Sequence, residues 1–288
     1  MRRAPTSRYE KRREPGRSTD RRQRAMIVAD LHVHTTRSDG TLPPEAVSDA
    51  ARAVDLEAVA VTDHDRLPPV DAPVVERDGV TVIAGIELRV TTGEQRLDLL
   101  GFGVDPTPEL RAETDRLQAD RIERARQIVD CVEDRLGVDL DLEMHDGIGR
   151  PHIARAIAES SAPYDAQSAF EALIGTDRPC YVARDLPAFE RGRALLADAA
   201  ALVGLAHPLR YDDPEGALAH AADLDAVERN YPYDGAVDMT SVEDVIATHD
   251  LLATGGSDAH GETLGKAGLE RDAYERVQTA LGDGSAES

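Results

Sequence analysis

The chain has 288 residues, which is enough for one large domain, or for a domain with a sizeable insertion, built around its own core. Hydrophobic residues make up 41% of it, which excludes a disordered protein, and no stretch approaches the roughly 18 consecutive apolar residues of a membrane span. Its 55 Asp and Glu outnumber its 33 Lys and Arg, and the net charge of −22 argues against a long nucleic-acid groove, which needs a basic surface.

The acidic charge follows a basic N-terminus. Residues 1–24 hold ten basic and three acidic residues, so the remaining 264 residues carry 23 basic and 52 acidic groups. Only Lys11 and Lys266 are lysines. An acidic, lysine-poor surface resembles that of proteins from salt-loving (halophilic) organisms, in which hydrated carboxylates keep the chain soluble. Molar salt would also weaken the objection to nucleic-acid binding, because it screens charge.

The first 25 residues are rich in Arg, Pro and Ser and offer almost nothing to bury, so we expect a disordered basic tail. Three interpretations stay open: a start codon assigned upstream of the true one at Met26, a tail without function, or a nucleic-acid-binding arm. No apolar signal core is present, so a cytoplasmic location is expected. Cys131 and Cys180 show no paired motif spacing, and we expect buried or idle thiols rather than a disulfide or a metal clip.

From residue 26, short apolar runs alternate with helical patterns. In chain order we expect a strand at 26–33, a helix at 41–53, strands at 56–62, 80–85 and 96–102, a long helix at 107–137, further helices at 150–200, and short strands at 201–206, 226–230 and 251–254. This alternation favours an α/β barrel or a doubly wound sheet. Residues 26–106 and 201–270 would form the barrel, 107–200 a helical insertion subdomain, and 271–288 a C-terminal helix and tail.

The first strand ends in a pair of histidines. His32 and His34 are two residues apart, so their side chains project from the same face of the strand. Two imidazoles converging at a strand end suit Zn, Mn or Fe. A pair of hydrogen-bonded polar histidines would be the simpler interpretation if this motif stood alone.

The other predicted strands also end in side chains that bind metals. These ends read Thr-Asp-His-Asp at 62–65, Gly-Ile-Glu at 85–87, Ala-His-Pro at 206–208 and Gly-Ser-Asp-Ala-His at 256–260. In a parallel barrel the carboxyl ends of the strands share one face, where active sites gather. The sequence therefore predicts a metal cluster at that face.

The order His-x-His, Ser-Asp-Gly, Thr-Asp-His, Gly-Ile-Glu, Ala-His-Pro and Gly-Ser-Asp-x-His resembles that of the PHP (polymerase and histidinol phosphatase) family over residues 27–105 and 201–261. The resemblance implies a distorted (β/α)7 TIM-like barrel, the PHP fold, with a trinuclear site. The metal ligands that it implies are His32, His34, Asp39, His64, Glu87, His207, Asp258 and His260. Glu87 would be the bridging carboxylate.

A second motif, Gly-Arg-Pro-His-Ile-Ala-Arg-Ala, covers residues 149–156. Its proline begins a helical pattern, which places His152 in the first turn beside free backbone N–H groups, and Arg150 just before it can grip phosphate oxygens. An ordinary helix start with exposed polar residues is the alternative. With the helical insert, the motif resembles the RNase AM (TrpH-like) subgroup, which hydrolyses 3′,5′-nucleoside bisphosphates and trims short RNA from the 5′ end. In that subgroup the histidine contacts substrate phosphate.

One position departs from the subgroup. Where its members usually read His-Leu-Leu-Gly, this chain has Asp98 followed by Leu-Leu-Gly. We expect Asp98 to be a ligand still, which would shift the preference toward Mn²⁺ or Mg²⁺; alternatively the third metal is weakened or absent. Two or three divalent ions are expected as cofactors, with Mn²⁺ favoured and Zn²⁺, Fe²⁺ or Mg²⁺ as alternatives.

Other polar residues take lesser roles. Arg121 and Arg124 lie three apart on the long predicted helix and would either complete a phosphate clamp or form solvated salt bridges. Asp63 and Asp65 are expected to orient His64 and its neighbours. Three further histidines fall in polar contexts away from strand ends and are expected at the surface: His145, His220 and His249.

The sequence thus predicts a metal-dependent phosphoesterase that uses a metal-activated water. Arg150 would offset charge on the phosphoryl oxygens, and His152 would position phosphate and protonate the leaving oxygen. We expect a monomer acting on a small nucleotide phosphate or short RNA, with no membrane partner and no stable complex with long nucleic acid; 3% aromatic residues leave little for base stacking. The alternatives are a histidinol-phosphate-type phosphatase and a non-catalytic nucleotide-binding module.

Overall fold

The computed structural model describes residues 26–282, so the predicted basic tail, 1–25, and the last six residues lie outside the described part. The strands within it are β1 (Ile27–Val33), β2 (Ala58–Val61), β3 (Val74–Arg77), β4 (Val80–Thr91), β5 (Arg96–Phe102), β6 (Leu202–Leu205), β7 (Ala226–Asn230), β8 (Leu252–Gly255) and β9 (Leu269–Glu270). The α-helices are α1 (Val47–Ala53), α2 (Pro108–Leu136), α3 (Arg150–Glu159), α4 (Ala166–Ala169), α5 (Phe189–Ala197), α6 (Pro214–Ala219), α7 (Thr240–His249) and α8 (Arg271–Leu281). None of these helices is both long and apolar enough to cross a membrane.

The strands form a distorted, nearly closed barrel. Their order is β8-β7-β6-β5-β4-β2-β1-β9, with β3 added along β4. A bridge between Val33 and Ala259 joins the chain after β8 to the end of β1. Most barrel strands are buried along nearly their whole length, as expected where helices cover a sheet. The predicted TIM-like barrel is confirmed.

Strand β5 runs antiparallel to both of its neighbours, β4 and β6, whereas β1, β2 and β4 are parallel to one another, as are β6, β7 and β8. Its first residues therefore lie at the rim where the parallel strands end. In this register Asp98 of β5 lies directly opposite Arg89 of β4. Asp98 stands near the start of β5. Because β5 is antiparallel to its neighbours, Asp98 lies at the rim where the parallel strands end.

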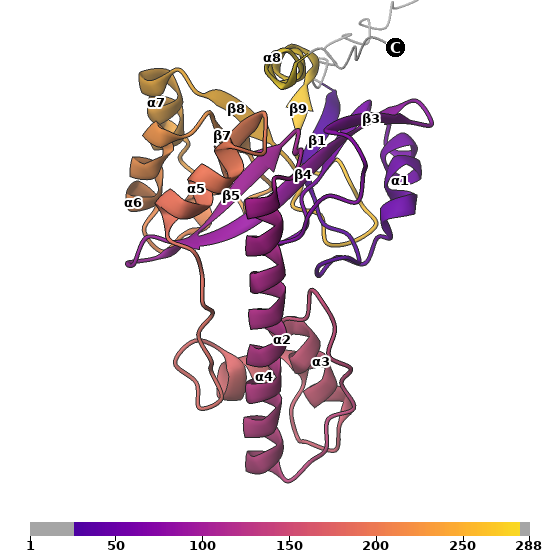
Figure 1. Ribbon diagram of the computed structural model, residues 1–288, viewed down its shortest axis with the longest axis vertical. Helices are drawn as coiled ribbons and strands as arrows, with labels where there is room; N and C mark the ends of the chain where they lie inside the picture. Colours follow the sequence, from indigo (N-terminus) through magenta and orange to yellow (C-terminus); the bar gives the residue numbers. More distant parts are fainter. Residues whose placement is uncertain (1–25, 283–288) are drawn as a thin grey trace, which may run out of the picture.

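The long helix α2 leads away from the barrel and carries α3 and α4 beside its far half (Figure 1). Thr107 caps its first turn by accepting a hydrogen bond from the Leu110 backbone, and the helix ends at Gly137, whose φ of 65° favours glycine. The near half of α2 packs into the barrel core, whereas its far half forms a separate core with α3 and the π-helical turn 170–174. The insert therefore has hydrophobic packing of its own.

Helix α5 lies inside the predicted insertion range of 107–200 but packs on the barrel. Its buried residues Leu195 and Leu196 belong to the same core cluster as Leu88 and Leu99 of β4 and β5. The chain has thus returned to the barrel by Phe189.

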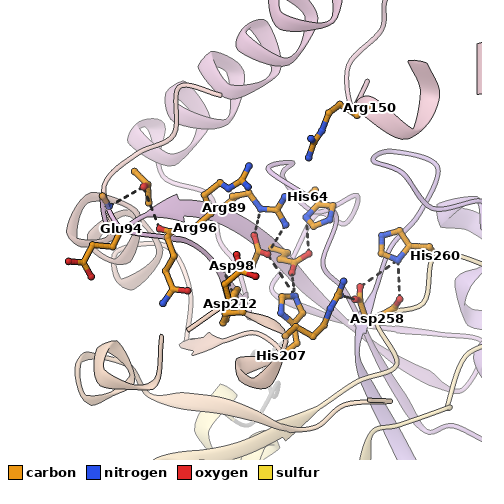
Figure 2. Close-up of a pocket in the computed structure, with 16 residues that line it drawn as sticks. His64, Arg89, Glu94, Arg96, Asp98, Arg150, His207, Asp212, Asp258 and His260 are labelled. Atoms are coloured by element: carbon orange, nitrogen blue, oxygen red, sulfur yellow. Dashed lines mark hydrogen bonds and ion pairs between the residues drawn. The ribbon is translucent and has the colours of Figure 1, made fainter. Parts of the chain in front are cut away.

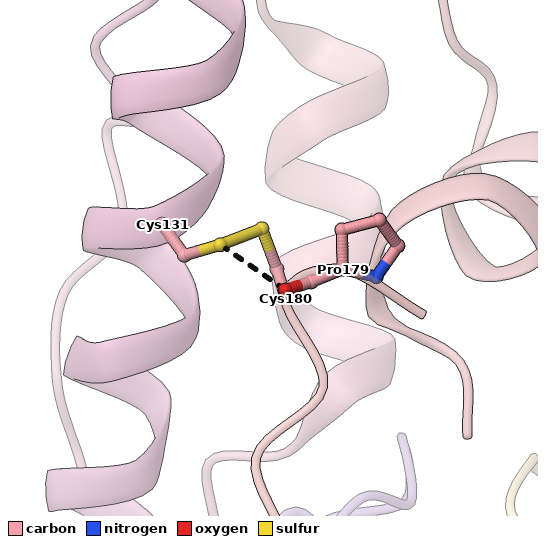
Figure 3. The surroundings of a disulfide bond; sticks show 3 residues. All are labelled: Cys131, Pro179 and Cys180. Atoms are coloured by element: carbon pink, nitrogen blue, oxygen red, sulfur yellow. Dashed lines mark hydrogen bonds between the residues drawn. A yellow bond between two sulfur atoms is a disulfide. The ribbon is translucent and has the colours of Figure 1, made fainter. Parts of the chain in front are cut away.

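The expectation of unpaired thiols was wrong. Cys131 on α2 and Cys180 form a disulfide, with their Cα atoms 5.6 Å apart and a sequence separation of 49 (Figure 3). Spacing alone could not reveal the pair, because the chain passes through α3 and α4 before it returns to α2. The Cys180 backbone N–H donates to the Leu173 carbonyl, which fixes the returning segment. The bond therefore ties this segment covalently to the long helix.

Candidate metal centre

Histidines and carboxylates from five regions of the chain meet at one rim of the barrel. His32 and His34 come from the end of β1, and Glu87 from the middle of the long strand β4; all three side chains are fully buried. The others follow β1, β2, β6 and β8 in loops: Asp39, His64, His207, Asp258 and His260. The structure thus brings all eight residues of the predicted ligand set together.

Four donor atoms enclose a first position for an ion. His32 Nε2 and His34 Nε2 are 3.1 Å apart, and they lie 3.4 and 3.3 Å from Glu87 Oε2. Asp258 Oδ1 is 3.1 Å from His34 Nε2 and 3.6 Å from His32 Nε2. Atoms that bind one ion at ~2.1 Å in tetrahedral or octahedral geometry are separated by ~3.0–3.4 Å. The spacing of the four atoms therefore fits a shared ion.

A second group lies beside the first, nearer to the surface. His260 Nε2 is 3.3 Å from Asp39 Oδ1, and His64 Nε2 is 3.8 Å from Asp39 Oδ2. His34 belongs to this group too, with its Nδ1 4.0 Å from Asp39 Oδ1. His64 Nδ1 lies 2.8 Å from Glu87 Oε2, which links the two groups through Glu87. These separations leave room for a second ion.

The third corner of the cluster, formed by His207 and Asp98 beside Glu87, has wider spacing between its donor atoms. His207 Nε2 contacts Glu87 Oε1 at 3.1 Å, but Asp98 Oδ2 is 3.8 Å from His207 Nε2. Both oxygens of Asp98 accept hydrogen bonds from Arg89, at 2.6 Å from Nε and 2.7 Å from Nη2. Asp98, expected as a metal ligand, is thus paired with a guanidinium.

Several buried polar atoms of the cluster have no hydrogen-bond partner within residues 26–282: His34 Nδ1, Asp39 Oδ1, His64 Nδ1, Glu87 Oε2 and His207 Nδ1. Buried polar groups are nearly always paired in native proteins, so a concentration of exceptions indicates a missing ligand. Imidazole nitrogens and carboxylate oxygens together suit divalent transition metals. The first two groups fit divalent ions on these grounds.

The electrostatics of the metal-free cluster point the same way. Burial by itself lowers the pKa of His34, but hydrogen bonds with Asp258 and Glu87 outweigh it and raise that pKa to about 10. Burial would raise the pKa of Asp258, yet His34 and His32 hold it well below its usual range. Without metal, protons held on the histidines balance the charge of the ionised carboxylates. A bound cation would take that role and release the protons.

The PHP domain family matches residues 30–169 of the chain. The 3′,5′-nucleoside bisphosphate phosphatase of Chromobacterium violaceum is 32% identical over 199 residues, which cover 65% of this chain and 69% of that protein. This chain belongs to the PHP domain family. The 5′-3′ exoribonuclease Rnm of Escherichia coli is 26% identical over 251 residues, covering 81% of this chain and 85% of that one.

A solved structure agrees with this assignment. It is an amidohydrolase from Chromobacterium violaceum with bound sulfate and no metal, 26% identical, with a TM-score of 0.71 over 88% of this chain and 96% of that one. The predicted family and fold are thus confirmed, and this PHP protein is a metal-dependent phosphoesterase.

Buried carboxylates behind the PHP cluster hold its loops in place. Asp63 was expected to orient His64, but its oxygens accept hydrogen bonds from the backbone and hydroxyl of Thr35, each at 2.7 Å, and from the hydroxyl of Ser38 at 2.6 Å. It therefore shapes the loop that carries Asp39. Asp65 faces the insert, where its Oδ2 accepts from Arg121 at 2.6 Å and from Arg184 at 2.9 Å.

The sequence reasoning missed Glu228 of β7. This fully buried carboxylate lies 3.1 Å from His32 Nδ1 and accepts from the His207 backbone N–H at 2.8 Å, so it orients two of the histidines. The available signal was a charged residue inside the short apolar strand 226–230. Asp30 was also overlooked; it accepts from the backbones of Ser257 and Gly265 and so positions the loop after β8.

Two residues at the same rim have strained backbones. His207 and Asp258 have φ values of 28° and 47°, which cost free energy for residues other than glycine and occur mostly at functional sites. Gly256 lies so close to His32 that a Cβ would overlap its backbone, which explains the glycine there. The loops after β6 and β8 are thus held in unfavourable conformations that bring their side chains to the cluster.

A cleft of about 480 Å³ opens beside the cluster. Four arginines line it together with His64, Glu87, Asp258 and His260: Arg89, Arg96, Arg150 and Arg210. Figure 2 shows Arg150 reaching in from the insert, across the cleft from the barrel residues. Its guanidinium lies over the rings of Phe170 and Tyr181, at 5.6 and 5.7 Å from their centroids. An arginine-rich cleft suits a substrate with negative charges.

The other predicted substrate contacts are placed differently. His152 is half-buried, and its Nδ1 accepts a hydrogen bond from the Gly149 backbone. His152, Arg121 and Arg124 are all absent from the described residues that line the cleft. Arg121 pairs with Asp65, and the nearly buried Arg124 donates to the Val182 carbonyl at 2.7 Å. As placed, these two arginines hold the insert together and join it to the barrel.

The three histidines expected at the surface differ in exposure. His145 and His249 are exposed, and the His145 ring stands edge-on to His152. His220 is only half-buried and packs against Phe189.

Proposed function

We propose that this protein hydrolyses phosphate esters of nucleotides, acting as a 3′,5′-nucleoside bisphosphate phosphatase, a 5′-3′ exoribonuclease on short RNA, or both. The observation that carries the proposal is the shared cleft: arginines from the barrel and from the insert line the same space as the His, Asp and Glu cluster. A substrate with two phosphates can then place one at the cluster and the other near Arg150. The names of the relatives from Chromobacterium violaceum and Escherichia coli support this substrate class.

The proposed ligands divide into two sets. One ion would be held by His32, His34, Glu87 and Asp258, and a second by Asp39, His64 and His260, with Glu87 near both. The mixture of carboxylates and imidazoles favours Mn²⁺, with Zn²⁺, Fe²⁺ or Mg²⁺ as alternatives. When bound, the ions activate the attacking water and offset charge on the phosphoryl oxygens.

Arg150 binds phosphate in this proposal. Its stacking on Phe170 and Tyr181 keeps the guanidinium extended into the cleft, and one edge stays available for a pair of phosphate oxygens.

His152 would act through one ring nitrogen. Because Nδ1 accepts from Gly149, the neutral ring carries its proton on Nε2, which is the atom left to donate to a phosphate or leaving oxygen. Burial, then the nearby His145 and Arg155, lower the pKa of His152, which favours this neutral form at pH 7. His152 can thus donate a hydrogen bond without carrying a charge.

The proposal is tested by measuring phosphate release from 3′,5′-bisphosphate nucleotides, 3′- and 5′-monophosphates, histidinol phosphate and a 5′-labelled short RNA. Each substrate is assayed with Mn²⁺, Mg²⁺, Zn²⁺ and Fe²⁺ at low and molar salt. We expect the highest kcat/KM with the bisphosphate or the short RNA. Preference for histidinol phosphate would support the alternative phosphatase. Tight nucleotide binding without phosphate release under any metal would indicate a binding module.

We further propose that the protein acts as a monomer in the cytoplasm of a salt-loving cell. The composition supports the last point, since the net charge is −22 and lysine is nearly absent. Light scattering in low and molar KCl would test the oligomeric state, and activity that rises with salt would support the halophilic assignment.

A further inference from the structure

The third corner of the metal centre contains a fixed positive charge supplied by the protein. Asp98 is nearly fully buried, and its two oxygens accept from Arg89 Nε at 2.6 Å and Nη2 at 2.7 Å. This is bidentate pairing, the geometry in which a guanidinium binds a carboxylate most strongly. The pair is therefore among the strongest ion pairs that an arginine can form.

The backbone on both sides holds the pair in place. Arg89 and Asp98 are direct partners across β4 and β5. The Arg89 backbone N–H donates to Asp65 at 3.0 Å, and the Asp98 backbone N–H donates to the Tyr211 hydroxyl at 2.9 Å. Neither residue can shift without disturbing these contacts. The backbones that carry the pair are thus held in place at the rim.

The pair leaves a poor environment for a third metal ion. A dication bound by Asp98 would lie beside the guanidinium on the same carboxylate, and the two cations would repel each other. His64, Glu87 and Asp98 do offer ligand atoms within 4.8 Å of one another, but both oxygens of Asp98 already accept hydrogen bonds from the guanidinium. Asp98 Oδ2 is also 3.8 Å from His207 Nε2, farther than the ~3.0–3.4 Å between ligands of one ion. The trinuclear site implied by the family resemblance does not fit these residues.

We propose that Arg89 takes the place of a third metal: the centre holds two ions, and the guanidinium contacts the substrate phosphate from the third side. Pairing with Asp98 uses Nε and Nη2, which leaves the Nη1 hydrogens free to bind a phosphate oxygen. Arg89 is one-third exposed and lines the cleft. The inference deepens the proposed function, because it assumes that a phosphate occupies this cleft.

The first test counts metal ions. Protein equilibrated with Mn²⁺ and freed of excess metal is analysed for Mn and protein content, for the wild type, Asp98→Asn and the double variant Arg89→Ser with Asp98→His. We expect two ions per chain in the wild type and in Asp98→Asn, and three in the double variant, which removes the guanidinium and supplies a neutral ligand. Three ions in the wild type would overturn the proposal. A double variant that still binds two would show that Arg89 does not exclude the third.

The second test measures the phosphate contact. In samples supplied with two Mn²⁺ per chain, Arg89→Gln should weaken binding of inorganic phosphate about tenfold or more relative to the wild type. The matched control is Arg111→Gln, an exposed arginine on α2, which should leave phosphate affinity unchanged. Equal phosphate affinity in Arg89→Gln and the wild type would refute the contact. Both tests are independent of turnover, so failure of the proposed nucleotide hydrolysis would be recognised separately.

Discussion

The barrel rim and the helical insert supply different parts of one site, and they are held by different means. At the rim, backbone register fixes the side chains: His32, His34 and Glu87 are fully buried, on strands whose partners are set by the sheet. Arg150 on the insert depends instead on a separate apolar core and one disulfide. Changes in the insert should therefore weaken substrate binding while leaving the reaction centre at the rim intact.

The two regions meet at Asp65. Its carboxylate accepts hydrogen bonds from Arg121 and Arg184, and its backbone carbonyl accepts from the Gln118 side chain at 2.8 Å. The nearby Arg184 and Arg121 overcome the effect of burial and keep the pKa of Asp65 well below its usual range. This buried charge network couples the position of Arg150 to the end of β2.

The largest effect is expected from changing the rim. Asp258→Ala removes one of the four donor atoms around the first position and should lower kcat about 10³-fold or more. The variant should lose some stability in EDTA, because Asp258 also lies 3.1 Å from the buried His34, but it should still fold, since its other partner Arg210 is half-exposed and can be solvated. Phosphate release with Mn²⁺ measures kcat, and thermal melting in EDTA measures stability.

Two further variants make this test decisive. Asp244→Ala, an exposed change on α7, is the matched control and should retain activity. Full turnover in both Asp258→Ala and His64→Ala would refute the site.

The next effect concerns the insert. Replacing Cys131 and Cys180 by serine opens a loop of 49 residues, which should lower the free energy of unfolding of the insert by about 4 kcal/mol. KM for a bisphosphate should rise as Arg150 loses its fixed position, while hydrolysis of a small aryl phosphate should continue. Thermal melting with and without dithiothreitol measures the loss. The reductant should not affect the double serine variant, and identical melting of oxidised and reduced wild type would contradict the prediction.

Arg150→Ala tests the same difference between the rim and the insert with a single substitution. Loss of a charged hydrogen-bond donor should raise KM for a bisphosphate about 10- to 100-fold, with little effect on kcat for a small aryl phosphate. Arg150→Lys should recover only part of the affinity, because lysine lacks the planar fork that stacks on Phe170 and Tyr181. Arg126→Ala, at an exposed arginine of α2, is the control. An equal loss of kcat on both substrates would place Arg150 in the reaction centre instead.

The contrast also explains what the sequence could predict. The barrel and the convergence of His32, Glu87 and Asp258 followed from one rule, that parallel strands deliver their carboxyl ends to one face. Glu87 lies mid-strand, however, because β4 continues to Thr91 where the pattern indicated an end at residue 85. That continuation carries Arg89, whose charge is balanced by Asp98 directly opposite on β5.

Contacts distant in sequence escaped prediction for a different reason. Pairing of Cys131 with Cys180, and of Asp65 with Arg121 and Arg184, depends on how the insert folds back, and no local pattern encodes that path. Strand β3 was missed because its residues are half-buried or exposed, so it lacks an apolar pattern.

The remaining predicted effect is a pH dependence that separates the metal-free rim from the metal-loaded one. In the metal-free protein, burial lowers the pKa of His34, but Asp258 and Glu87 raise it to about 10, above the ~6.5 of an unfolded chain. Its stabilising contribution is therefore complete below pH ~6.5 and is lost as the pH rises toward 10.

Metal binding needs neutral imidazole, so each proton released strengthens binding by ~1.4 kcal/mol per pH unit. The Tm difference between Mn²⁺-loaded and EDTA-treated protein should thus grow from pH 6 to pH 9, measured by differential scanning fluorimetry. His249→Gln, far from the rim on exposed surface, should show the same growth, and a difference that stays constant or shrinks would mean that the rim histidines do not exchange protons for metal.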